Sequence, residues 1–491
     1  MKNFSKYIIM GAILLAGSSC GDGWLNLESS TSVSTDGAIK ELKDVNLALN
    51  GIYSTMQSSS AYTGRLVYYG DATGDDMQAV STTKRTGDAY TFGFTKDNSP
   101  SSYWAYPYKM ITMCNIILTQ IDKLKINEAD TELRDAYKGE ALALRGMFLF
   151  DLTRLYGYPY KKDNGASLGA PVVTEVLKES AKPSRKTVAE CYNQVIEDLK
   201  SAATLLDNDE GNSYYKGHIN RWGVLTLLSR IYLYHGNDAL ALQAAEEAIK
   251  GAEAEGYALW TNAEYATAWS NDASKSKKGE VLFEIVNTTE EGPGKESLGY
   301  LHNANGYSDI AVTSSFYAMM KEDPDDVRNQ LFRLDGNKWA FLFKYQPQAG
   351  ETIDNANVPL LRLSETYLNA AEAAVKTNDN TKAVKYLDAI VSRANPANTV
   401  EGTNVTLERV MLERRKELVG EGHRMYDALR DGGYVERRDV DLGEELTTKH
   451  LTLSDQQKKR FNWDYFKCVL AVPKAERDAN PNIAQNPEYG E

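Results

Sequence analysis

The amino-acid sequence predicts a mainly α fold, built from helical hairpins and interrupted by an irregular insert. Nine segments carry apolar residues at the i, i+3, i+4, i+7 spacing of an amphipathic helix. They are 44–57, 109–124, 133–156, 187–206, 221–234, 238–254, 363–377, 381–393 and 407–429. Between 257 and 362 this periodicity is lost, and Gly, Asn, Ser and Tyr become frequent. We therefore expect a helical scaffold that carries a loop-rich surface.

Two of the expected helix pairs share one register. Within 221–251, Ala241 and Ala245 occupy the small-residue positions of a tetratricopeptide (TPR) hairpin. A shift of 142 residues repeats the pattern at Ala383 and Leu387. Small side chains at these positions let two helices approach closely, so the pattern predicts a TPR-like hairpin scaffold. The two repeats are far apart in the chain, which argues against a simple tandem array.

Short β-like runs are expected in the insert and in the loop-rich C-terminal tail. They lie at 281–286, 339–345 and 465–472. With the N-terminal signal described next, the sequence divides into five parts. These are a signal peptide at 1–19, a tether at 20–35, an N-terminal helical region at 36–256, a C-terminal region at 257–491 and, within it, the insert at 257–362.

The N-terminus has the pattern of an export signal. Two lysines precede a ten-residue apolar run at 7–16, which is too short to span a membrane. Small residues then lead into Cys20 in the order Gly17-Ser18-Ser19-Cys20, which resembles a lipobox. This interpretation makes Cys20 the acylated first residue of the mature chain. The alternative is an ordinary signal peptide cut after Ser18.

The composition limits the classes of partner. With 42% hydrophobic residues the chain is too apolar to be disordered. The net charge of −13 argues against nucleic acid, because neutralising phosphates requires a basic surface. Tyrosine is unusually frequent, with 30 Tyr against 12 Phe. A tyrosine ring is apolar with a polar tip, which is typical of wet binding surfaces.

Motifs for catalysis and for metal or cofactor binding do not stand out. There is no H-E-x-x-H, Walker A or G-x-G-x-x-G motif, and the four cysteines show no C-x-x-C spacing. The acidic run 207–211 lacks the glycine and glutamate of a calcium-binding EF-hand loop. Carboxylate pairs at 75–76 and 323–326 are of the kind that glycosidases use, but adjacent acidic residues in a loop are more often solvated charges. We therefore predict no enzyme, no metal site and no cofactor.

Five further segments follow one another along the chain. They are YWAYPY at 103–108, RLYG at 154–157, PLLR at 359–362 with AEA at 371–373, ERRKEL at 413–418 with EGHRMYDALR at 421–430, and the closing NP and QNPEY runs at 480–481 and 485–489. As an ordered set they resemble the SusD/RagB family of surface nutrient-binding lipoproteins. The charges of the fourth segment lie at helical spacings and predict a fold-holding network of ion pairs. The prolines of the fifth segment predict an extended strip that covers the helices.

The resemblance implies a lipid-anchored protein on the outer face of the outer membrane. Such a protein captures an oligosaccharide, or in some members a peptide, and acts as a hinged lid on a SusC-like TonB-dependent barrel. No bond is broken in this role. One alternative is a TPR lipoprotein that binds only protein partners. Another is a helical glycoside hydrolase, which would need two convergent carboxylates in a cleft.

Aromatic residues in loops are the expected sugar contacts, since a pyranose presents an apolar C–H face that stacks on a flat ring. The candidates are Tyr68, Tyr69 and Tyr90 in the N-terminal loops, Tyr300, Tyr307 and Trp339 in the insert, and Asn303, Asn305 and Asp309 as polar neighbours. Trp104 belongs to the family's aromatic segment and is a further candidate, although a role in the core is favoured for it.

Overall fold

The computed structural model describes residues 39–208, 211, 216–270, 279–446, 448–451 and 456–490. The helices of the N-terminal half are α2(Leu42–Met56), α3(Arg65–Ala72), α4(Gly87–Tyr90), α5(Ser102–Ile121), α6(Thr131–Tyr156), α7(Tyr160–Asp163), α8(Val188–Leu205), α9(Arg221–His235) and α10(Asp238–Ala254). Those that follow are α11(Tyr265–Ala268), α12(Leu298–Leu301), α13(Ser314–Lys321), α14(Leu363–Lys376), α15(Asn380–Ala394), α16(Leu407–Leu418), α17(Arg424–Leu429) and α18(Lys474–Ala479). The prediction of a mainly α fold is confirmed. The signal peptide, the tether and Cys20 lie outside the described residues.

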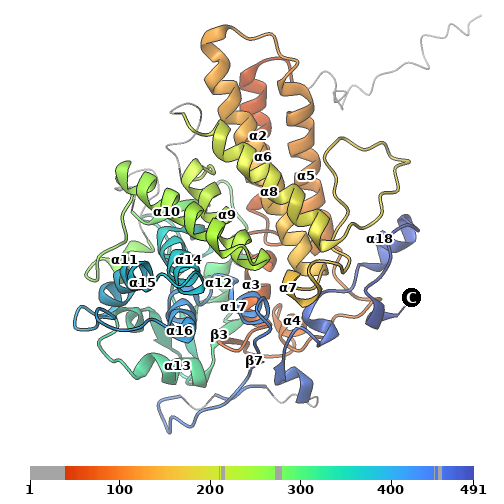
Figure 1. Cartoon of the computed structure of the whole chain (residues 1–491). Helices are drawn as coiled ribbons and strands as arrows, with labels where there is room; N and C mark the ends of the chain where they lie inside the picture. The colour runs from red at the N-terminus through yellow and green to blue at the C-terminus, as the bar shows by residue number, and fades with distance from the viewer. Residues whose placement is uncertain are drawn as a thin grey trace, which may run out of the picture.

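The long helices form one continuous array. α5 packs against α6, α6 against α8, α8 against α9, and α9 against α10. In Figure 1, α2, α5, α6 and α8 stand together, and the shorter pairs α9–α10 and α14–α15 continue the array beside them. Buried side chains from all of these helices join a single hydrophobic core. The described helices include none with both the length and the apolar character needed to cross a membrane.

The 142-residue repeat extends to the turns of the two hairpins. Gly236, between α9 and α10, has φ of +92°, and Asn378, at the equivalent place between α14 and α15, has φ of +61°. The next residue caps the second helix in both cases. The Asn237 side chain accepts from the backbone N–H three residues on, as does that of Asp379. The two hairpins are therefore built on one local plan.

Helix packing brings the two repeats together in space. α10 packs directly against α14, although the whole insert lies between them in the sequence. Ala241 and Ala383, the small residues of the predicted crossings, are both fully buried. The insert therefore leaves the helical array after α10 and returns to it at α14, so that the repeats adjoin.

The insert and its surroundings carry short antiparallel strands. β2(Val281–Ile285) pairs with β6(Val358–Arg362), while β1(Met77–Ala79), β3(Ile310–Val312), β5(Ala340–Leu342) and β4(Phe332–Leu334) form a four-stranded sheet in that order. β7(Val435–Glu436) and β8(Arg460–Phe461) pair in the tail. The strands expected at 281–286 and 339–345 are confirmed as β2 and β5, the second of which is shorter than expected.

The prediction of a strand at 465–472 is wrong. This run begins with a 3₁₀ helix, Phe466–Cys468, and continues as extended chain without a paired strand. The Leu470 N–H donates to the Leu155 carbonyl at the end of α6 at 2.7 Å. An apolar run can be extended and buried against helices without a neighbouring strand, and periodicity does not distinguish the two cases.

The C-terminal strip covers the end of α6, as its prolines predict. The side-chain amide of Asn486 donates to the carbonyls of Tyr156 and Leu470, each at 3.0 Å. Arg185, from the loop before α8, donates to the Ala484 carbonyl at 3.0 Å. The Asn486 amide thus satisfies the carbonyl of Tyr156, one of those that the end of α6 leaves without a helical partner, and the other bonds hold the tail in place.

A buried network of ion pairs ties the insert to the helices. The guanidinium of Arg362, at the end of β6, donates to Glu280, to Glu417 at 3.1 Å and to Glu421 at 2.7 Å. Arg430, directly after α17, donates to Glu372 of α14 at 2.6 Å. The predicted fold-holding role of the 413–430 charges is thus confirmed.

Candidate ligand-binding site

A cavity of about 570 Å³ lies between the loop after α12 and the β4–β5 hairpin. Its size falls within the range of roughly 300–1,000 Å³ that small-molecule sites occupy. The lining residues are His302, Asn303, Ala304, Asn305, Arg333, Leu334, Asp335, Gly336, Phe341 and Phe343. Amide, carboxylate and guanidinium groups therefore share this cavity with two aromatic rings.

The loop after α12 is held in shape by hydrogen bonds within the loop. The Asn303 side-chain oxygen accepts from the Asn305 N–H at 2.9 Å, and the Asn303 carbonyl accepts from the Gly306 N–H at 2.9 Å. A Cβ on Gly306 would lie 2.1 Å from the Tyr300 carbonyl oxygen, so only glycine fits there. Asn303 and Asn305 are consequently presented at the cavity by a tight turn.

The opposite wall of the cavity is a hairpin turn that is held by hydrogen bonds within the turn. The Asp335 carboxylate accepts from the backbone N–H groups of Asn337 at 3.0 Å and Trp339 at 2.8 Å. Lys338 has φ of +62° in the same turn. The indole of Trp339, directly before β5, is half-buried. This turn fixes the backbone from which Trp339 projects.

Two tyrosines bracket the loop that carries the asparagines. The rings of Tyr300 and Tyr307 meet edge to face, with centroids 4.9 Å apart, and both are half-buried. The guanidinium of Arg85 lies 4.0 Å above the Tyr307 ring and donates to Glu296 at 2.6 Å. One side of Tyr307 is thus already occupied by a cation–π contact.

His302 lies on the floor of the cavity as a neutral imidazole. It is 2% exposed, and neither ring nitrogen has a hydrogen-bond partner among the described residues. Burial, followed by the nearby Lys344 ammonium, lowers the pKa of His302 to about 3. At neutral pH this ring therefore offers one donor and one acceptor without a charge.

The structure brings together part of the predicted site. Asn303 and Asn305 line the cavity, Trp339 belongs to the turn that forms its other wall, and Tyr300 and Tyr307 flank the asparagine loop. Asp309 is close in sequence but fully buried, where it pairs with Arg85 at 3.3 Å. Its carboxylate acts within the fold, and its predicted place as a polar neighbour on the ligand surface is wrong.

The N-terminal aromatic candidates are in the core. Tyr68 and Tyr69 belong to α3 and Tyr90 to α4, so the prediction that they lie exposed in loops is wrong. The Tyr69 ring meets Tyr103 edge to face at 5.5 Å. A ring enclosed in this way has no free face for a sugar. The core role favoured for Trp104 is confirmed, since it is 3% exposed. 

Of the ten lining residues, sequence reasoning named only Asn303 and Asn305. It missed His302 and Ala304 beside them and six residues of the hairpin region: Arg333, Leu334, Asp335, Gly336, Phe341 and Phe343. A signal for them was present. Asp335-Gly336 is a hairpin-turn dipeptide between two short apolar runs, and it predicts a β-hairpin. What the dipeptide does not indicate is that the hairpin faces the asparagine loop.

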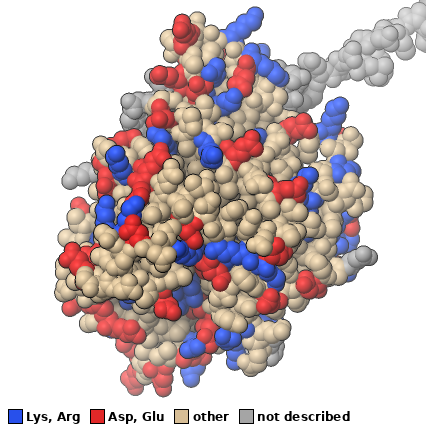
Figure 2. All heavy atoms as spheres, in the orientation of Figure 1, with Lys and Arg blue, Asp and Glu red and all other residues tan. Residues whose placement is uncertain are grey.

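Charge is mixed over the surface. On the face drawn in Figure 2, acidic and basic side chains are interspersed instead of forming one basic patch. Among the described residues, no group of three or more His, Cys, Asp or Glu side chains is placed to hold a metal ion. The cavity offers hydrogen-bonding groups and aromatic rings to a ligand.

Comparison with known proteins identifies the class of protein. Residues 23–233 match the family model described as "Starch-binding associating with outer membrane", and residues 324–489 match the SusD family model. A crystal structure of a putative sugar binding protein from Bacteroides vulgatus is 59% identical, with a TM-score of 0.89, over 92% of this chain and 100% of that one. The chain belongs to the SusD/RagB family.

Other relatives agree with this assignment. A SusD superfamily protein from the same organism is 37% identical, with a TM-score of 0.84, over 92% of this chain and 100% of the other. SusD-like protein P38 of Formosa agariphila is 22% identical over 89% of this chain and 93% of its own length. The resemblance inferred from the five segments is confirmed.

Proposed function

We propose that this protein binds an oligosaccharide in the cavity between the Asn303–Asn305 loop and the β4–β5 hairpin. The observation that carries the proposal is the cavity itself, in which Asn303, Asn305 and Asp335 lie close to Phe341 and Phe343. The family model's description as starch-binding and the sugar-binding name of the relative at 59% identity support the same ligand class.

The physical match lies in the pairing of flat rings with fixed polar groups. A pyranose has an apolar face of C–H groups and a rim of hydroxyls, each of which both donates and accepts. Trp339 offers a half-buried indole, while the amides and Asp335 offer acceptors and donors for the rim. Loops held by their own hydrogen bonds lose little entropy when the ligand orders them.

We infer a wider role, which family membership supports. The protein delivers its ligand to a SusC-like TonB-dependent outer-membrane barrel and breaks no bond. It is held on the outer face of the outer membrane by acyl chains on Cys20, where two or more chains give an anchor that one alone does not. The outer-membrane association in the family model's description supports this location.

Glycan-array screening of the mature chain, followed by calorimetry on a bound glycan, tests the ligand class. Trp339→Ala, Tyr300→Ala and Asn303→Ala are the informative variants, and at least one should weaken binding ten-fold, or about 1.4 kcal/mol. Tyr434→Ala is the control, since Tyr434 is an exposed aromatic that belongs to neither the loop after α12 nor the β4–β5 hairpin. If no glycan binds and peptides do, the ligand is a peptide and not a sugar.

Two experiments test the delivery role. Purification from native membranes should recover this chain together with a much larger β-barrel, and recovery of the chain alone would count against a lid on a transporter. Cys20→Ala should move the protein from the membrane pellet to the soluble fraction. If it stays in the pellet with its lipid label, the anchor is elsewhere.

A further inference from the structure

A small cavity of about 30 Å³ lies where the end of α6 meets α8, α9, α17 and the C-terminal tail. Its volume exceeds the roughly 10–15 Å³ that one water molecule needs, and it is far below the roughly 300 Å³ at which sites for small organic molecules begin. None of its lining residues belongs to the loop after α12 or to the β4–β5 hairpin. The cavity therefore has room for water or for one monatomic ion, and not for a sugar.

The lining of this cavity is rich in hydrogen-bond donors. Three tyrosines of different helices and two arginines are among the lining residues: Arg154 of α6, Tyr192 of α8, Tyr234 of α9, Tyr426 of α17 and Arg430 directly after α17. None of the described residues that line the cavity is acidic. A guanidinium group only donates, and a tyrosine hydroxyl has one hydrogen to donate. This combination favours a ligand that accepts hydrogen bonds and carries a negative charge.

Two of these donors have no hydrogen-bond partner among the described residues. They are the Tyr234 hydroxyl and the Nε of Arg154, and both atoms are buried. Tyr234 as a whole is 5% exposed. A buried donor without a partner costs free energy, and nearly all such groups in native proteins bind protein, water or an ion. The two donors therefore indicate a small occupant of the cavity.

The two positive charges are held at the cavity by other contacts. Arg154 donates to Asp151, and its guanidinium lies 4.4 Å from the centroid of the Tyr426 ring. Arg430 donates to Glu372 at 2.6 Å. Because these contacts fix both guanidinium groups, little conformational entropy is lost when a ligand binds beside them.

The tyrosine hydroxyls keep their hydrogens at neutral pH. Burial raises the pKa of Tyr192, Tyr234 and Tyr426, and the charge of Arg154 opposes that rise in each of them. One guanidinium group therefore acts on all three hydroxyls, and each hydroxyl remains a donor.

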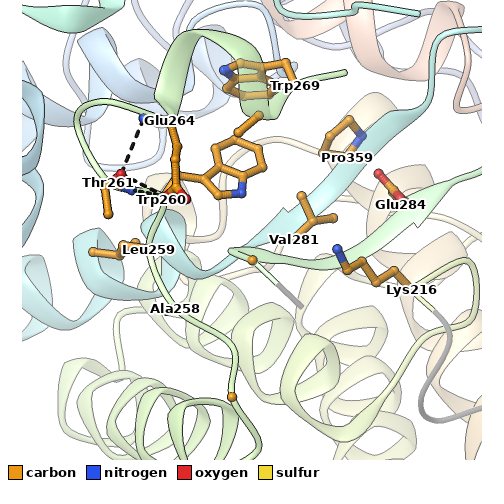
Figure 3. A pocket seen from close by; sticks show the side chains of 13 residues that line it. Lys216, Ala258, Leu259, Trp260, Thr261, Glu264, Trp269, Val281, Glu284 and Pro359 are labelled. Carbon is orange, nitrogen blue, oxygen red and sulfur yellow. Dashed lines mark hydrogen bonds between the residues drawn. The ribbon is translucent and has the colours of Figure 1, made fainter. Parts of the chain in front are cut away.

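The larger pocket beside Trp260 has a lining of the opposite sign. It measures about 340 Å³, and its charged lining residues are Lys216, Glu264 and Glu284. Figure 3 shows Lys216 and Glu284 at one side of that pocket and Glu264 at the other. Two carboxylates and one ammonium group do not favour an anion, so the lining of the small cavity is not a general property of the pockets of this fold.

We propose that the cavity between α6, α9 and α17 binds one chloride ion. The Tyr234 hydroxyl and the Arg154 Nε–H donate to the ion, and the hydroxyls of Tyr192 and Tyr426 complete the set of donors. A chloride ion accepts from all of these groups, whereas a water molecule also needs acceptors for its own two hydrogens. Since Cys468 and Val469 of the tail also line the cavity, the bound ion stabilises the packing of the tail on the helices.

The test measures urea and thermal unfolding of the full mature chain at constant ionic strength, with sodium gluconate replaced stepwise by sodium chloride. The cavity exists only in the folded protein, so stability should rise with the chloride concentration as binding to the native state requires. Bromide should replace chloride, whereas sulfate is too large to do so. Anomalous scattering from crystals grown in bromide should place one ion beside Tyr234.

Tyr234→Phe removes one donor and keeps the ring. It should raise the chloride concentration for half-maximal stabilisation at least ten-fold. Tyr232→Phe is the matched control, because it makes the same change two residues earlier on α9, where the side chain lies on another face of the helix. This variant should keep the chloride dependence of the unmodified protein.

Three results would overturn the proposal. The first is a stability of the unmodified protein that does not change with chloride, or changes equally with gluconate. The second is an equal chloride dependence in Tyr234→Phe and the unmodified protein. The third is a loss of stability in Tyr234→Phe at every chloride concentration alike, which would assign a water molecule to the cavity. None of these results bears on the oligosaccharide site at Asn303.

Discussion

The paired helical hairpins and the insert between them are held in shape by different interactions. At the helix crossings, Ala241 and Ala383 are fully buried and the turns of α9–α10 and α14–α15 repeat one capping pattern. In the insert, the Asn303 loop and the Asp335 turn leave their side chains half-exposed and hold their shape through local hydrogen bonds. Close packing stabilises the scaffold, while the loops that it positions form the proposed ligand site.

The junction between these regions is ionic. Arg362 ends β6 and precedes α14, so its contacts with Glu280, Glu417 and Glu421 join insert and helices in one cluster. A buried ion pair adds little stability over an apolar substitute, but removal of one partner leaves buried charge without compensation. The junction is therefore where a single substitution should affect both regions.

The largest effect is expected from Arg362→Met. The loss of the guanidinium leaves three buried carboxylates short of a partner and should lower the free energy of unfolding by about 3–5 kcal/mol. Urea denaturation measures it. Lys474→Ala is the control, since the Lys474 side chain is 54% exposed and its pair with Asp478 is worth about 0–1 kcal/mol. Equal effects from the two variants would mean that the junction does not couple the regions.

A smaller loss is expected from Ala241→Phe in the scaffold. The larger side chain overpacks the crossing of α10 with its neighbours and should cost about 1–3 kcal/mol in thermal or chemical denaturation. Ala239→Phe places the same ring on the exposed face of α10 and should change little. An unchanged melting curve for Ala241→Phe would show that the crossing is not as close as the repeat requires.

The insert should show a pH dependence of its own through His302. Its folded-state pKa of about 3 lies below the value of about 6.5 in an unfolded chain. Between these values the unfolded state takes up a proton that the folded state does not. The stabilisation is therefore complete above pH 6.5 and is lost by about 1.4 kcal/mol for each unit that the pH falls toward 3.

His302→Phe removes this dependence. Between pH 7 and pH 5, the free energy of unfolding of the variant should fall less steeply than that of the unmodified protein, as measured by urea titrations at each pH. Other acid-sensitive groups are common to both proteins and cancel in the difference. If the free energy of unfolding of both proteins fell equally with pH, the His302 ring would be accessible to water in the folded protein.

The smallest effect on stability is expected from Trp339→Ala. The half-buried indole lies on the rim of the hairpin, so the free energy of unfolding should change by no more than about 0.5 kcal/mol. The affinity for a bound glycan should nevertheless fall. A large drop in melting temperature would mean that Trp339 stabilises the fold. Trp339 could then not be assigned to ligand contact alone.

Sequence reasoning reached most of the scaffold because its signals are local. Helical periodicity and the Ala positions of the repeat reflect neighbours within a few turns of helix. The charges at 413–430 indicated an ion-pair network, but their partners include Arg362 and Glu372 from distant segments. The five ordered segments and the family that they indicate are likewise readable without coordinates. Cys20 and the signal before it remain predictions from the sequence.

The tertiary structure determines which aromatic rings stay partly exposed. Tyr69 and Tyr300 are the same residue type in similarly mixed stretches, yet Tyr69 is enclosed by α5 and Tyr300 is half-buried beside a loop. Exposure depends on which distant segment packs over a ring, and that partner is not encoded near the ring in the chain. The same reason applies to the cavity that brings Asn303 to Asp335. This cavity is made by contacts between segments that only the folded chain brings together.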